Sequence, residues 1–223
     1  MFSSCGSLVD ANKAFRALST PNVYAWGAII NAHVRFHCKK KAFELYLEMI
    51  KACVEPDGHV FASVIKACAC KEGLSYGREI HRKVRECGLK PDMIINNALI
   101  DMYMKCGSVK EASEVFESLK VRNLVTWNAM ISGHEQNGQF KQTFGLFQRM
   151  LEEKVMPNCI TFSSILKTCS TPSFLCDGKI LHSHCIEWSC ERDTVLCRSL
   201  VDMYAKCGSL ENALSVFDKL STR

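Results

Sequence analysis

Apolar residues between positions 93 and 119 fall into two groups, each with the spacing of a helix face. In the first group, Ala98, Leu99, Met102 and Tyr103 recur at intervals that place them on one side of a helix. After Gly107 comes a second group, which consists of Val109, Ala112, Val115, Phe116 and Leu119. The segment is therefore predicted to form two amphipathic helices in antiparallel order, joined by a turn at the glycine.

Polar and turn-forming residues mark where such helices begin and end. Ser108 with Glu111 has the spacing of a capping box, which satisfies the free amides at a helix start. Asn137 and Gly138 are typical of a tight turn. Proline lacks an amide hydrogen and is expected to end the second helix of a pair, and the relevant prolines are Pro21, Pro56, Pro91 and Pro157.

The whole pattern recurs along the chain with a period of 101 residues. The stretch Met102–Arg122 returns as Met203–Arg223 with 11 of 21 positions identical, and Met1–Asn22 is a third, weaker copy. Further pairs at this spacing are Trp26 and Trp127, Phe61 and Phe162, Cys68 and Cys169, Gly77 and Gly178, and His81 and His182. A long period built from smaller repeats predicts an elongated stack in which each repeat packs only on its neighbours.

Boundary residues divide the 101-residue block into three helical pairs. Each of the four prolines is followed by an asparagine or aspartate that closes a repeat. The expected repeats are a partial one at 1–22, then 23–57, 58–92, 93–123, 124–158, 159–193, and a nearly complete one at 194–223. The predicted fold class is all-α, a solenoid of stacked helix-turn-helix repeats.

Composition agrees with a folded array. Hydrophobic residues make up 48% and charged residues 23% of the chain, which supports a continuous core and excludes wholesale disorder. The net charge of +5 permits an anionic partner without requiring one. Neither an apolar run of membrane-spanning length nor a signal-peptide pattern is present, so no membrane partner is expected.

The fourteen cysteines do not follow a metal or disulfide pattern, because no Cys-x-x-Cys occurs. Several recur with the repeat: Cys5, Cys106 and Cys207 in one place, Cys68 and Cys169 in another. We therefore expect buried, reduced thiols that pack as small apolar groups. A structural metal and scattered reactive thiols are the alternatives.

One dense group of potential metal ligands occurs, at His182, His184, Cys185 and Cys190. His182 is the counterpart of His81, whose surroundings lack the other three residues. A packing role is therefore expected in preference to metal binding, and no cofactor is expected in the chain.

Three motifs carry a resemblance to a known repeat family. They are Val125–Ile131 (VTWNAMI), Phe162–Lys167 (FSSILK), and Asn97–Tyr103 (NALIDMY) followed by Lys105–Ser108 (KCGS). With these motifs and the length series 35, 35 and 31, the chain resembles the pentatricopeptide repeats, in particular the plant subfamily that alternates P, L and S repeats. Tetratricopeptide repeats are the alternative, but their Trp-Leu-Gly and Tyr spacing is not matched.

The resemblance implies a right-handed superhelical α-solenoid whose repeats are of three types. The implied P repeats are 23–57 and 124–158, the L repeats 58–92 and 159–193, and the S repeats 93–123 and 194–223, after a partial S repeat at 1–22. The family resembled binds single-stranded RNA, with one base read by each repeat.

Base reading is assigned by the resemblance to the fifth and the last residue of a repeat. In two repeats both residues are asparagines, Asn97 with Asn123 and Asn128 with Asn158. A carboxamide offers a donor and an acceptor, and in the family this combination implies a pyrimidine. The alternative for the fifth-position asparagines is a role as helix caps.

The other repeats carry different pairs, which are Ser163 with Asp193, Gly27 with Asp57, and Ala62 with Asp92. The first implies guanine, although the family's code is less dependable in an L repeat. Gly27 and Ala62 have no side-chain hydrogen-bonding group, so their repeats are expected to provide spacing. Arg198 replaces the expected asparagine of the sixth repeat, which puts base reading there in doubt.

The second residue of a repeat is the base clamp in the family resembled. Ile94, Val125, Ile160 and Val195 fit this role, and Tyr24 and His59 are variants. Ordinary packing between repeats is the alternative role for these side chains.

Cations at the ends of first helices are candidates for phosphate contacts. They are Lys105 and Lys206, with Arg35 as the equivalent in the first P repeat, and a solvated side chain is the alternative at each. The densest basic run is expected to be surface charge, and it consists of Lys39, Lys40 and Lys41.

No catalytic constellation is apparent in the sequence. A zinc deaminase needs a His-x-Glu and a Cys-x-x-Cys, and neither motif occurs. Asp101 and Asp202 are single, repeat-equivalent residues, not the cluster that a metal-dependent nuclease needs. The chain is therefore expected to be a non-catalytic, RNA-binding array, and a protein-binding scaffold is the alternative.

By the resemblance, such an array serves as the specificity part of cytidine-to-uridine editing of organellar transcripts. A C-terminal deaminase domain or editing proteins acting in trans would supply the chemistry. Met1 aligns with Met102 and Met203, which lie inside a repeat, so the chain is expected to be a fragment without a targeting peptide. A location in mitochondria or chloroplasts is implied by the resemblance alone.

Overall fold

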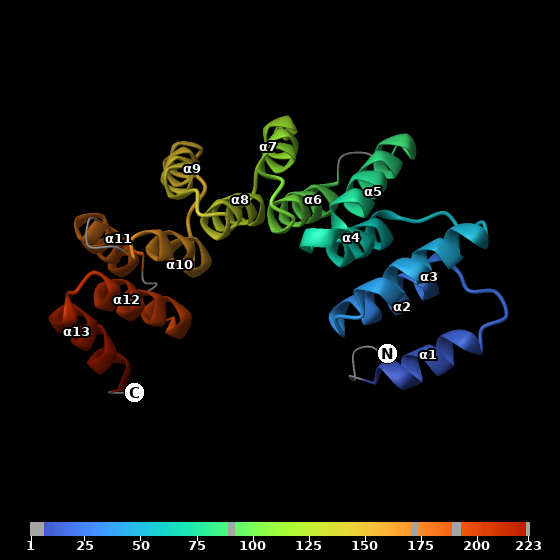
Figure 1. Ribbon diagram of the computed structural model, residues 1–223, viewed down its shortest axis with the longest axis horizontal. Helices are drawn as coiled ribbons and strands as arrows, with labels where there is room; N and C mark the ends of the chain where they lie inside the picture. Colours follow the sequence, from blue (N-terminus) through green and yellow to red (C-terminus); the bar gives the residue numbers. More distant parts are fainter. Residues whose placement is uncertain (1–6, 89–91, 171–173, 189–192, 222–223) are drawn as a thin grey trace. The chain divides into compact units, whose positions relative to one another are not determined.

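The computed structural model describes residues 7–88, 92–170, 174–188 and 193–221 (Figure 1). These residues form thirteen α-helices and one 3-10 turn, and no strand occurs among them. The predicted all-α class is confirmed. The chain forms two compact bodies, an N-terminal body at 1–119 and a C-terminal body at 120–223.

The N-terminal body consists of helical hairpins in which a first helix is followed by an antiparallel second helix (Figure 1). A single second helix, α1 (Leu8–Arg16), precedes them. The hairpins are α2 (Val23–Arg35) with α3 (Lys39–Lys51), α4 (Gly58–Ala67) with the 3-10 turn Lys71–Gly73 and α5 (Leu74–Glu86), and α6 (Met93–Lys105) with α7 (Val109–Ser118).

The C-terminal body repeats this order. Its hairpins are α8 (Leu124–Gln136) with α9 (Phe140–Glu152), α10 (Cys159–Thr168) with α11 (Leu175–Glu187), and α12 (Thr194–Lys206) with α13 (Leu210–Ser221). The first helices begin at the residues where the sequence places the starts of the repeats. The division of these repeats into P, L and S types stays a prediction.

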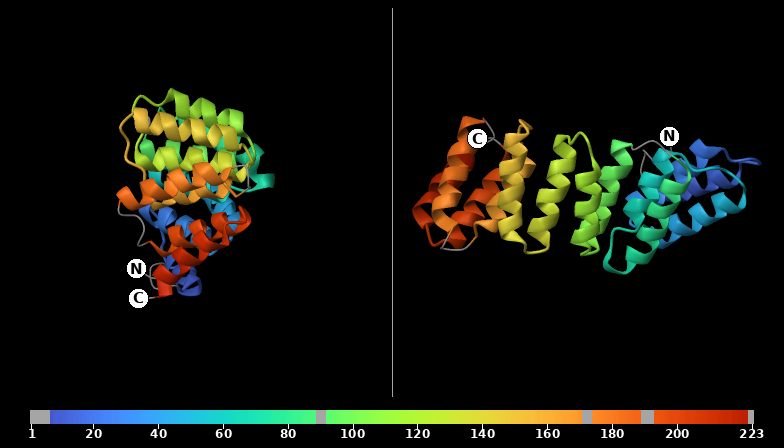
Figure 2. Two further views of the ribbon diagram at one scale, coloured as in Figure 1. Left: turned by 90° about the vertical axis from the view of Figure 1, so that its left-hand side faces the viewer. Right: turned by 90° about the horizontal axis from the view of Figure 1, so that it is seen from above.

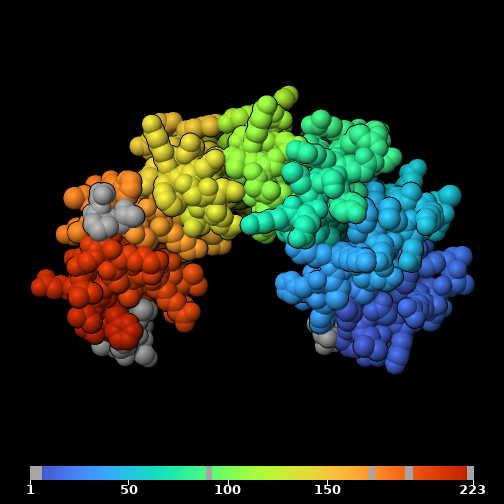
Figure 3. Space-filling model, in the orientation of Figure 1, coloured from blue at the N-terminus to red at the C-terminus, as the bar shows by residue number. Residues whose placement is uncertain are grey.

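First helices pack on first helices within each body. In the N-terminal body α4 contacts both α2 and α6, and in the C-terminal body α10 contacts both α8 and α12. The second helices cover this row, each against the first helix of its own hairpin, and the helices of a body stand side by side (Figure 2). Side chains fill the space between neighbouring hairpins (Figure 3). Each body therefore has the two-layer architecture of an α-solenoid.

Aromatic side chains fill the space between the first two hairpins of each body. The ring of Phe61 on α4 lies 6.3 Å from that of Tyr46 on α3, and the ring of Phe162 on α10 lies 6.0 Å from that of Phe147 on α9. Phe61 and Phe162 are fully buried. These paired rings contribute much of the apolar area that joins one hairpin to the next.

A glycine–methionine junction joins the second and third hairpins of each body. In the N-terminal body, a Cβ added to Gly77 on α5 would lie 2.5 Å from Sδ of Met102 on α6, so only glycine admits the methionine without displacement. The corresponding distance from Gly178 to Met203 is 2.6 Å. The two recurring glycines of the sequence are thus explained by close packing of a second helix on the next first helix.

A histidine–tyrosine hydrogen bond accompanies each junction. Nδ1 of His81 lies 2.9 Å from the hydroxyl of Tyr103, and Nδ1 of His182 lies 2.9 Å from that of Tyr204. Burial lowers the pKa of His81 and raises the pKa of Tyr103 to about 12, so both groups are neutral near pH 7. The expected packing role of His182 is confirmed, and Cys190 lies outside the described residues.

The recurring cysteines belong to the same junctions. The Cys106 thiol donates to the backbone oxygen of Cys70 at 3.0 Å, and the Cys207 thiol donates to that of Cys169 at 3.0 Å. Burial raises the pKa of Cys68 and of Cys169 to about 12. The prediction of buried, reduced thiols is confirmed for Cys68, Cys169 and Cys207, whereas the recurring Cys106 is only half-buried and Cys5 lies outside the described residues. The prediction is wrong for four exposed cysteines, which are Cys38, Cys53, Cys87 and Cys176.

The capping box predicted at Ser108 is wrong. The Ser108 hydroxyl makes no cap bond to the backbone and donates instead to the Glu111 carboxylate. Arg78 from α5 also donates to Glu111, at 2.7 and 2.9 Å, and the Ser108 amide donates to the Tyr103 oxygen at 2.8 Å in place of the carboxylate. A capping box does occur at α10, where Asn158 and Thr161 form it.

The prediction that proline ends the second helices is also wrong. α3 and α9 end earlier, because Cys53 and Lys154 adopt left-handed conformations with φ of 54° and 57°. The amide of the next residue then reaches back across the last turn, as in the bond of Val155 to the Met150 oxygen at 3.0 Å. The proline follows in the extended connection. The predicted turn at Asn137 and Gly138 is confirmed, with φ of 70° at the glycine.

The glycine–methionine junction predicts opposite effects of the same substitution at two helical glycines. Gly77→Ala is expected to lower the free energy of unfolding by about 1–3 kcal/mol, because the new methyl group displaces Met102 from a packed core. Gly145→Ala, inside α9 with nothing within 4 Å of the added Cβ, is expected to raise it by about 0.5–1 kcal/mol through helix propensity. Urea unfolding followed by circular dichroism measures both, and equal shifts would contradict the junction.

Candidate nucleic-acid interface

An exposed stripe runs along each first helix, and the second residue of the repeat stands at its start. The aliphatic side chains of Ile94, Val125, Ile160 and Val195 are between 46% and 61% exposed. The variant Tyr24 is 77% exposed, and His59 is exposed as well. Packing between repeats, the alternative role for these residues, is therefore wrong for them.

Exposed aliphatic groups at one register form a row in each body. Because α8, α10 and α12 pack in succession, Val125, Ile160 and Val195 project from neighbouring helices at the same level of the first turn. Flat, polarisable groups such as nucleobases fit between side chains of this kind, since each base has an apolar face. Scattered surface aliphatics need no explanation, but a repeated row points to a ligand with a matching repeat.

The last residue of every complete repeat caps the next first helix. Oδ1 of Asp57 accepts from the Val60 amide at 2.9 Å, and Oδ1 of Asn123 accepts from the Thr126 amide at 2.9 Å. The other caps of this kind are Asn22, Asp92, Asn158 and Asp193. The sequence carries this signal, an Asx residue directly before each apolar pattern, but the cap role of the last residues was not predicted.

Capping fixes which atom of the last residue remains available. The cap needs one side-chain oxygen, so neither the Nδ2 amide group of an asparagine such as Asn158 nor the second oxygen of an aspartate such as Asp193 takes part in it. The same backbone geometry thus offers a donor in one case and an acceptor in the other. Exchange of the two residue types reverses the polarity of the available group and preserves the helix start.

In the C-terminal body the fifth and the last residue of one repeat are in contact. Nδ2 of Asn128 donates to Oδ1 of Asn158 at 3.2 Å, and Oδ1 of Asn128 accepts from the Thr161 hydroxyl at 2.6 Å. Asn128 is half-buried and held in one orientation. The cap at α8 is Asn123 and the cap at α6 is Asp92, so the cap alternative for Asn128 and Asn97 is wrong.

The other predicted pairs differ from this geometry. Ser163 is only 7% exposed, and its hydroxyl lies 2.6 Å from that of Ser199 on α12. A Cβ on Gly27 would lie 3.3 Å from Cγ2 of Val60, so the glycine lets α4 approach α2 closely. Ala62 is buried. Asn97 belongs to the N-terminal body and Asn123 to the C-terminal body, and their pairing stays a prediction.

Two of the predicted phosphate contacts already have an anionic partner. Nζ of Lys105 donates to Asp101 at 2.7 Å, and Nζ of Lys206 donates to Asp202 at 2.6 Å. Arg35 is exposed at the end of α2. The lysine run at the start of α3 makes local contacts: Lys39 donates to the Ala69 oxygen at 2.9 Å, and Lys41 pairs with Glu44 at 3.1 Å.

Sequence reasoning missed two lysines on the exposed stripe. Lys66 on α4 and Lys167 on α10 stand seven residues after His59 and Ile160, about two helical turns along the same face. Both lysines are exposed, and neither forms an ion pair within the parts of the chain that the structure describes. The sequence signal that could have identified these lysines is that they occupy the same position in the two L-like repeats.

Metal and membrane sites are not indicated. Among the described residues, no group of three or more His, Cys, Asp or Glu side chains is arranged to hold a metal ion. None of the described helices is both long and apolar enough to cross a bilayer.

Hairpins stacked in two layers, with capped first helices and an exposed stripe, define a helical-repeat protein of the α-solenoid class. The sequence profile of the PPR repeat family matches residues 21–70 and 122–171, and that of the PPR repeat matches residues 97–124 and 195–223. Together these matches span more than half of the chain. The chain belongs to the pentatricopeptide repeat family.

Similar proteins share the fold and parts of the sequence. A chloroplastic pentatricopeptide repeat-containing protein of Arabidopsis thaliana is 32% identical over 222 residues, which are 100% of this chain and 36% of that protein. A mitochondrial one is 34% identical over 218 residues, 98% of this chain and 21% of that protein. The chain thus spans about a third or less of these relatives.

A solved structure has the same fold. The pentatricopeptide repeat protein PPR10, crystallised in complex with an 18-nt psaJ RNA element, superposes with a TM-score of 0.71 at 18% sequence identity. The match covers 99% of this chain and 32% of that one. The predicted solenoid fold is therefore confirmed.

The cap role of the last residues predicts that stability and base reading can be separated. Asn158→Ala is expected to lower the free energy of unfolding by about 1–2 kcal/mol, because the amides of Ile160 and Thr161 lose their acceptor. Asn158→Asp retains a cap oxygen and is expected to stay within about 0.5 kcal/mol of the wild type. Thermal and urea unfolding of the two variants measure this difference, and a loss as large for aspartate as for alanine would refute the assignment.

Proposed function

We propose that the chain binds single-stranded RNA along the stripe of its first helices, with one base at each repeat. The observation that supports this most is the row of exposed aliphatic side chains at the second position of the repeats. In this proposal one base lies between successive clamp residues, beside the fifth and the last residue of a repeat. The solved PPR10 complex contains RNA, which favours the same class of ligand here.

We infer that the Asn128–Asn158 pair reads a pyrimidine. The capped Asn158 presents an amide donor, and Asn128 is already oriented toward it. A pyrimidine edge offers acceptors such as the O2 oxygen to such donors, in keeping with the preference in the family. Asn97 and Asn123 carry the same residue types and are proposed to read an adjacent pyrimidine.

The remaining pairs contribute less to sequence selection. Ser163 is occupied by Ser199, so guanine reading with Asp193 would require that hydrogen bond to open. Gly27 with Asp57 provides an acceptor from the aspartate alone. We therefore expect modest selectivity, concentrated at the two asparagine pairs.

The array is proposed to position RNA and to leave catalysis to another domain or protein. By its family type we propose a P, L, S array that acts in organellar RNA processing, as the specificity part of cytidine-to-uridine editing. A deaminase would be supplied by a further domain or in trans. Similar Arabidopsis proteins are named as chloroplastic or mitochondrial, which supports an organellar location.

The reading pairs predict a loss of affinity that depends on RNA sequence. Asn97→Ala with Asn128→Ala is expected to weaken binding to an RNA with two adjacent pyrimidines by about 2–4 kcal/mol in total, from generic base-contact values, with helix content unchanged. Asn212→Ala on the second helix α13 is the matched control and is expected to bind as the wild type does. Fluorescence anisotropy measures the affinities, and equal binding of wild type and double variant to pyrimidine and purine RNAs would defeat the code.

The lysines of the stripe predict a change in salt dependence. Lys66→Ala with Lys167→Ala is expected to reduce the slope of log K against log salt by about 1.4, since each single-strand phosphate contact contributes about 0.7. Lys105→Ala with Lys206→Ala is expected to change the slope little, because Asp101 and Asp202 neutralise those ammonium groups. Titrations over a range of salt concentrations measure both slopes, and a larger effect of the second pair would overturn this assignment.

A further inference from the structure

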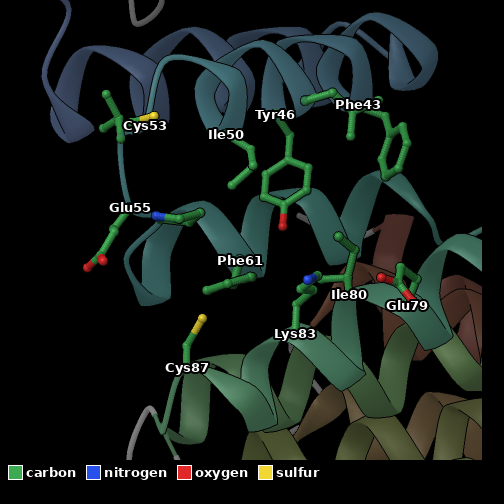
Figure 4. A pocket seen from close by; sticks show the side chains of 13 residues that line it. Phe43, Tyr46, Ile50, Cys53, Glu55, Phe61, Glu79, Ile80, Lys83 and Cys87 are labelled. Carbon is green, nitrogen blue, oxygen red and sulfur yellow. The ribbon is translucent and has the colours of Figure 1, made fainter.

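The N-terminal body carries an open cleft on the side of its second helices. Its volume is about 600 Å³, and it is lined by α3, α5, the start of α4 and the connection from α3 to α4 (Figure 4). Its apolar lining consists of partly exposed residues, which are Phe43, Leu47, Ile50 and Pro56, with the buried side chains of Tyr46, Phe61 and Ile80 behind them. The stripe proposed to bind RNA lies on the first helices, so the cleft is a separate feature of the repeat.

The C-terminal body contains a copy of the same framework 101 residues later, and there an indole occupies the corresponding place. Cys87 is the residue that caps the end of α5, and its counterpart at the end of α11 is Trp188. The ring of Trp188 lies 5.4 Å from that of Phe162, the counterpart of Phe61. Cys87 is exposed and lines the cleft, whereas Phe61 behind it is only 1% exposed, so the surface that the smaller cysteine leaves open lies on the outer wall of the cleft.

The proline that lines the cleft also differs in burial between the two bodies. Pro157 is buried in the body that has the tryptophan, whereas Pro56 is only half-buried in the body that has the cysteine. The cleft therefore leaves more of Pro56 exposed than the other copy, which has the tryptophan, leaves of Pro157. The comparison with the C-terminal body indicates the occupant, because there the indole of Trp188 lies among the residues that correspond to the lining of the cleft.

The rim of the open cleft is suited to a polypeptide. Leu47 and Ile50 on α3 are 43% and 44% exposed, and the counterpart of Leu47 in the other body is the polar Gln148. Glu79 and Lys83 on α5 add one charge of each sign beside this apolar edge. An apolar edge with a mixed polar rim is typical of a site that receives an anchor residue together with its flanking chain.

We propose that this cleft binds an aromatic side chain, tryptophan above all, that a partner protein presents. The indole would lie against Phe43, Ile50 and Pro56, in the place that corresponds to that of Trp188 in the other body, with its N–H toward the Tyr46 hydroxyl. Figure 4 shows the Tyr46 hydroxyl pointing between Phe61 and Ile80, where it can accept from an indole N–H. The partner's flanking residues would lie along Leu47 and Ile50.

A peptide selection tests this directly. Random peptides displayed on phage are selected on the wild-type chain and depleted on Cys87→Trp, in which the cleft is filled from within. The enriched peptides are expected to share a tryptophan or another aromatic residue. A synthetic peptide from this set is expected to bind Cys87→Trp about 30-fold or more weakly than the wild type, and Cys87→Ser, which leaves the cleft open, as the wild type does.

Two further variants keep the test decisive. Ile50→Glu changes only the rim and is expected to weaken the same peptide, which decides the matter if Cys87→Trp does not fold. Trp188→Cys opens the corresponding place in the C-terminal body and is expected to gain a second site for N-acetyltryptophanamide, measured by nuclear magnetic resonance.

Three results would overturn the proposal. They are enrichment of peptides without aromatic residues, equal peptide binding by the wild type and Ile50→Glu, and self-association of the wild type that Cys87→Trp abolishes. The last result would identify a second copy of the chain as the occupant. RNA affinity is expected to be the same for wild type and Ile50→Glu, so failure here is distinguishable from failure of the proposed RNA function.

Discussion

Burial of each first helix between its neighbours is the interaction on which the rest of the structure depends. A hairpin alone cannot cover its apolar residues, so α10 is packed by α8, α12 and its own hairpin partner α11. Most of its side chains are buried as a result, and Ile160 and Lys167 are its two exposed residues. Because packing accounts for the buried positions, an aliphatic group that stays exposed at the same register of successive helices needs another cause. The candidate RNA surface is therefore what remains after the core is explained.

Helix capping couples the fold to recognition. An Asx residue before each first helix stabilises the helix start, and the same side chain lies at the edge of the stripe. Since the cap uses one oxygen, the protein can exchange asparagine for aspartate there and present a donor or an acceptor at little cost in stability. This chain has aspartate at 57, 92 and 193 and asparagine at 22, 123 and 158. Specificity can thus vary along the array while every repeat folds in the same way.

The sequence was sufficient for the helical hairpins and their order, because apolar periodicity and the 101-residue period are local signals. The details that failed depend on contacts between hairpins. The Ser108 amide donates to the Tyr103 oxygen and Arg78 reaches Glu111 from another hairpin, so the expected capping box does not form, and nothing near Ser108 in the sequence indicates this. Cys53 and Lys154 end helices without glycine, so no turn residue marks those ends. The pairing of Lys105 with Asp101 could have been predicted, since the two residues are four apart on one helix.

The two bodies are copies of one another, so their sequences can be compared position by position. Residues at the junctions between helices are the same in both copies, whereas residues on the outer faces differ. The junction of Gly77 with Met102 is repeated at the second junction, because a side chain on the glycine would displace the packed methionine whatever the surface does. The outer faces are free of that constraint, and there Cys87 stands where the other copy has Trp188. Removal of a large aromatic group from a packed position costs several kcal/mol in stability when nothing replaces it. In the proposed complex a partner's aromatic residue would occupy the place that corresponds to Trp188, so a position used for packing in one body would serve for recognition in the other.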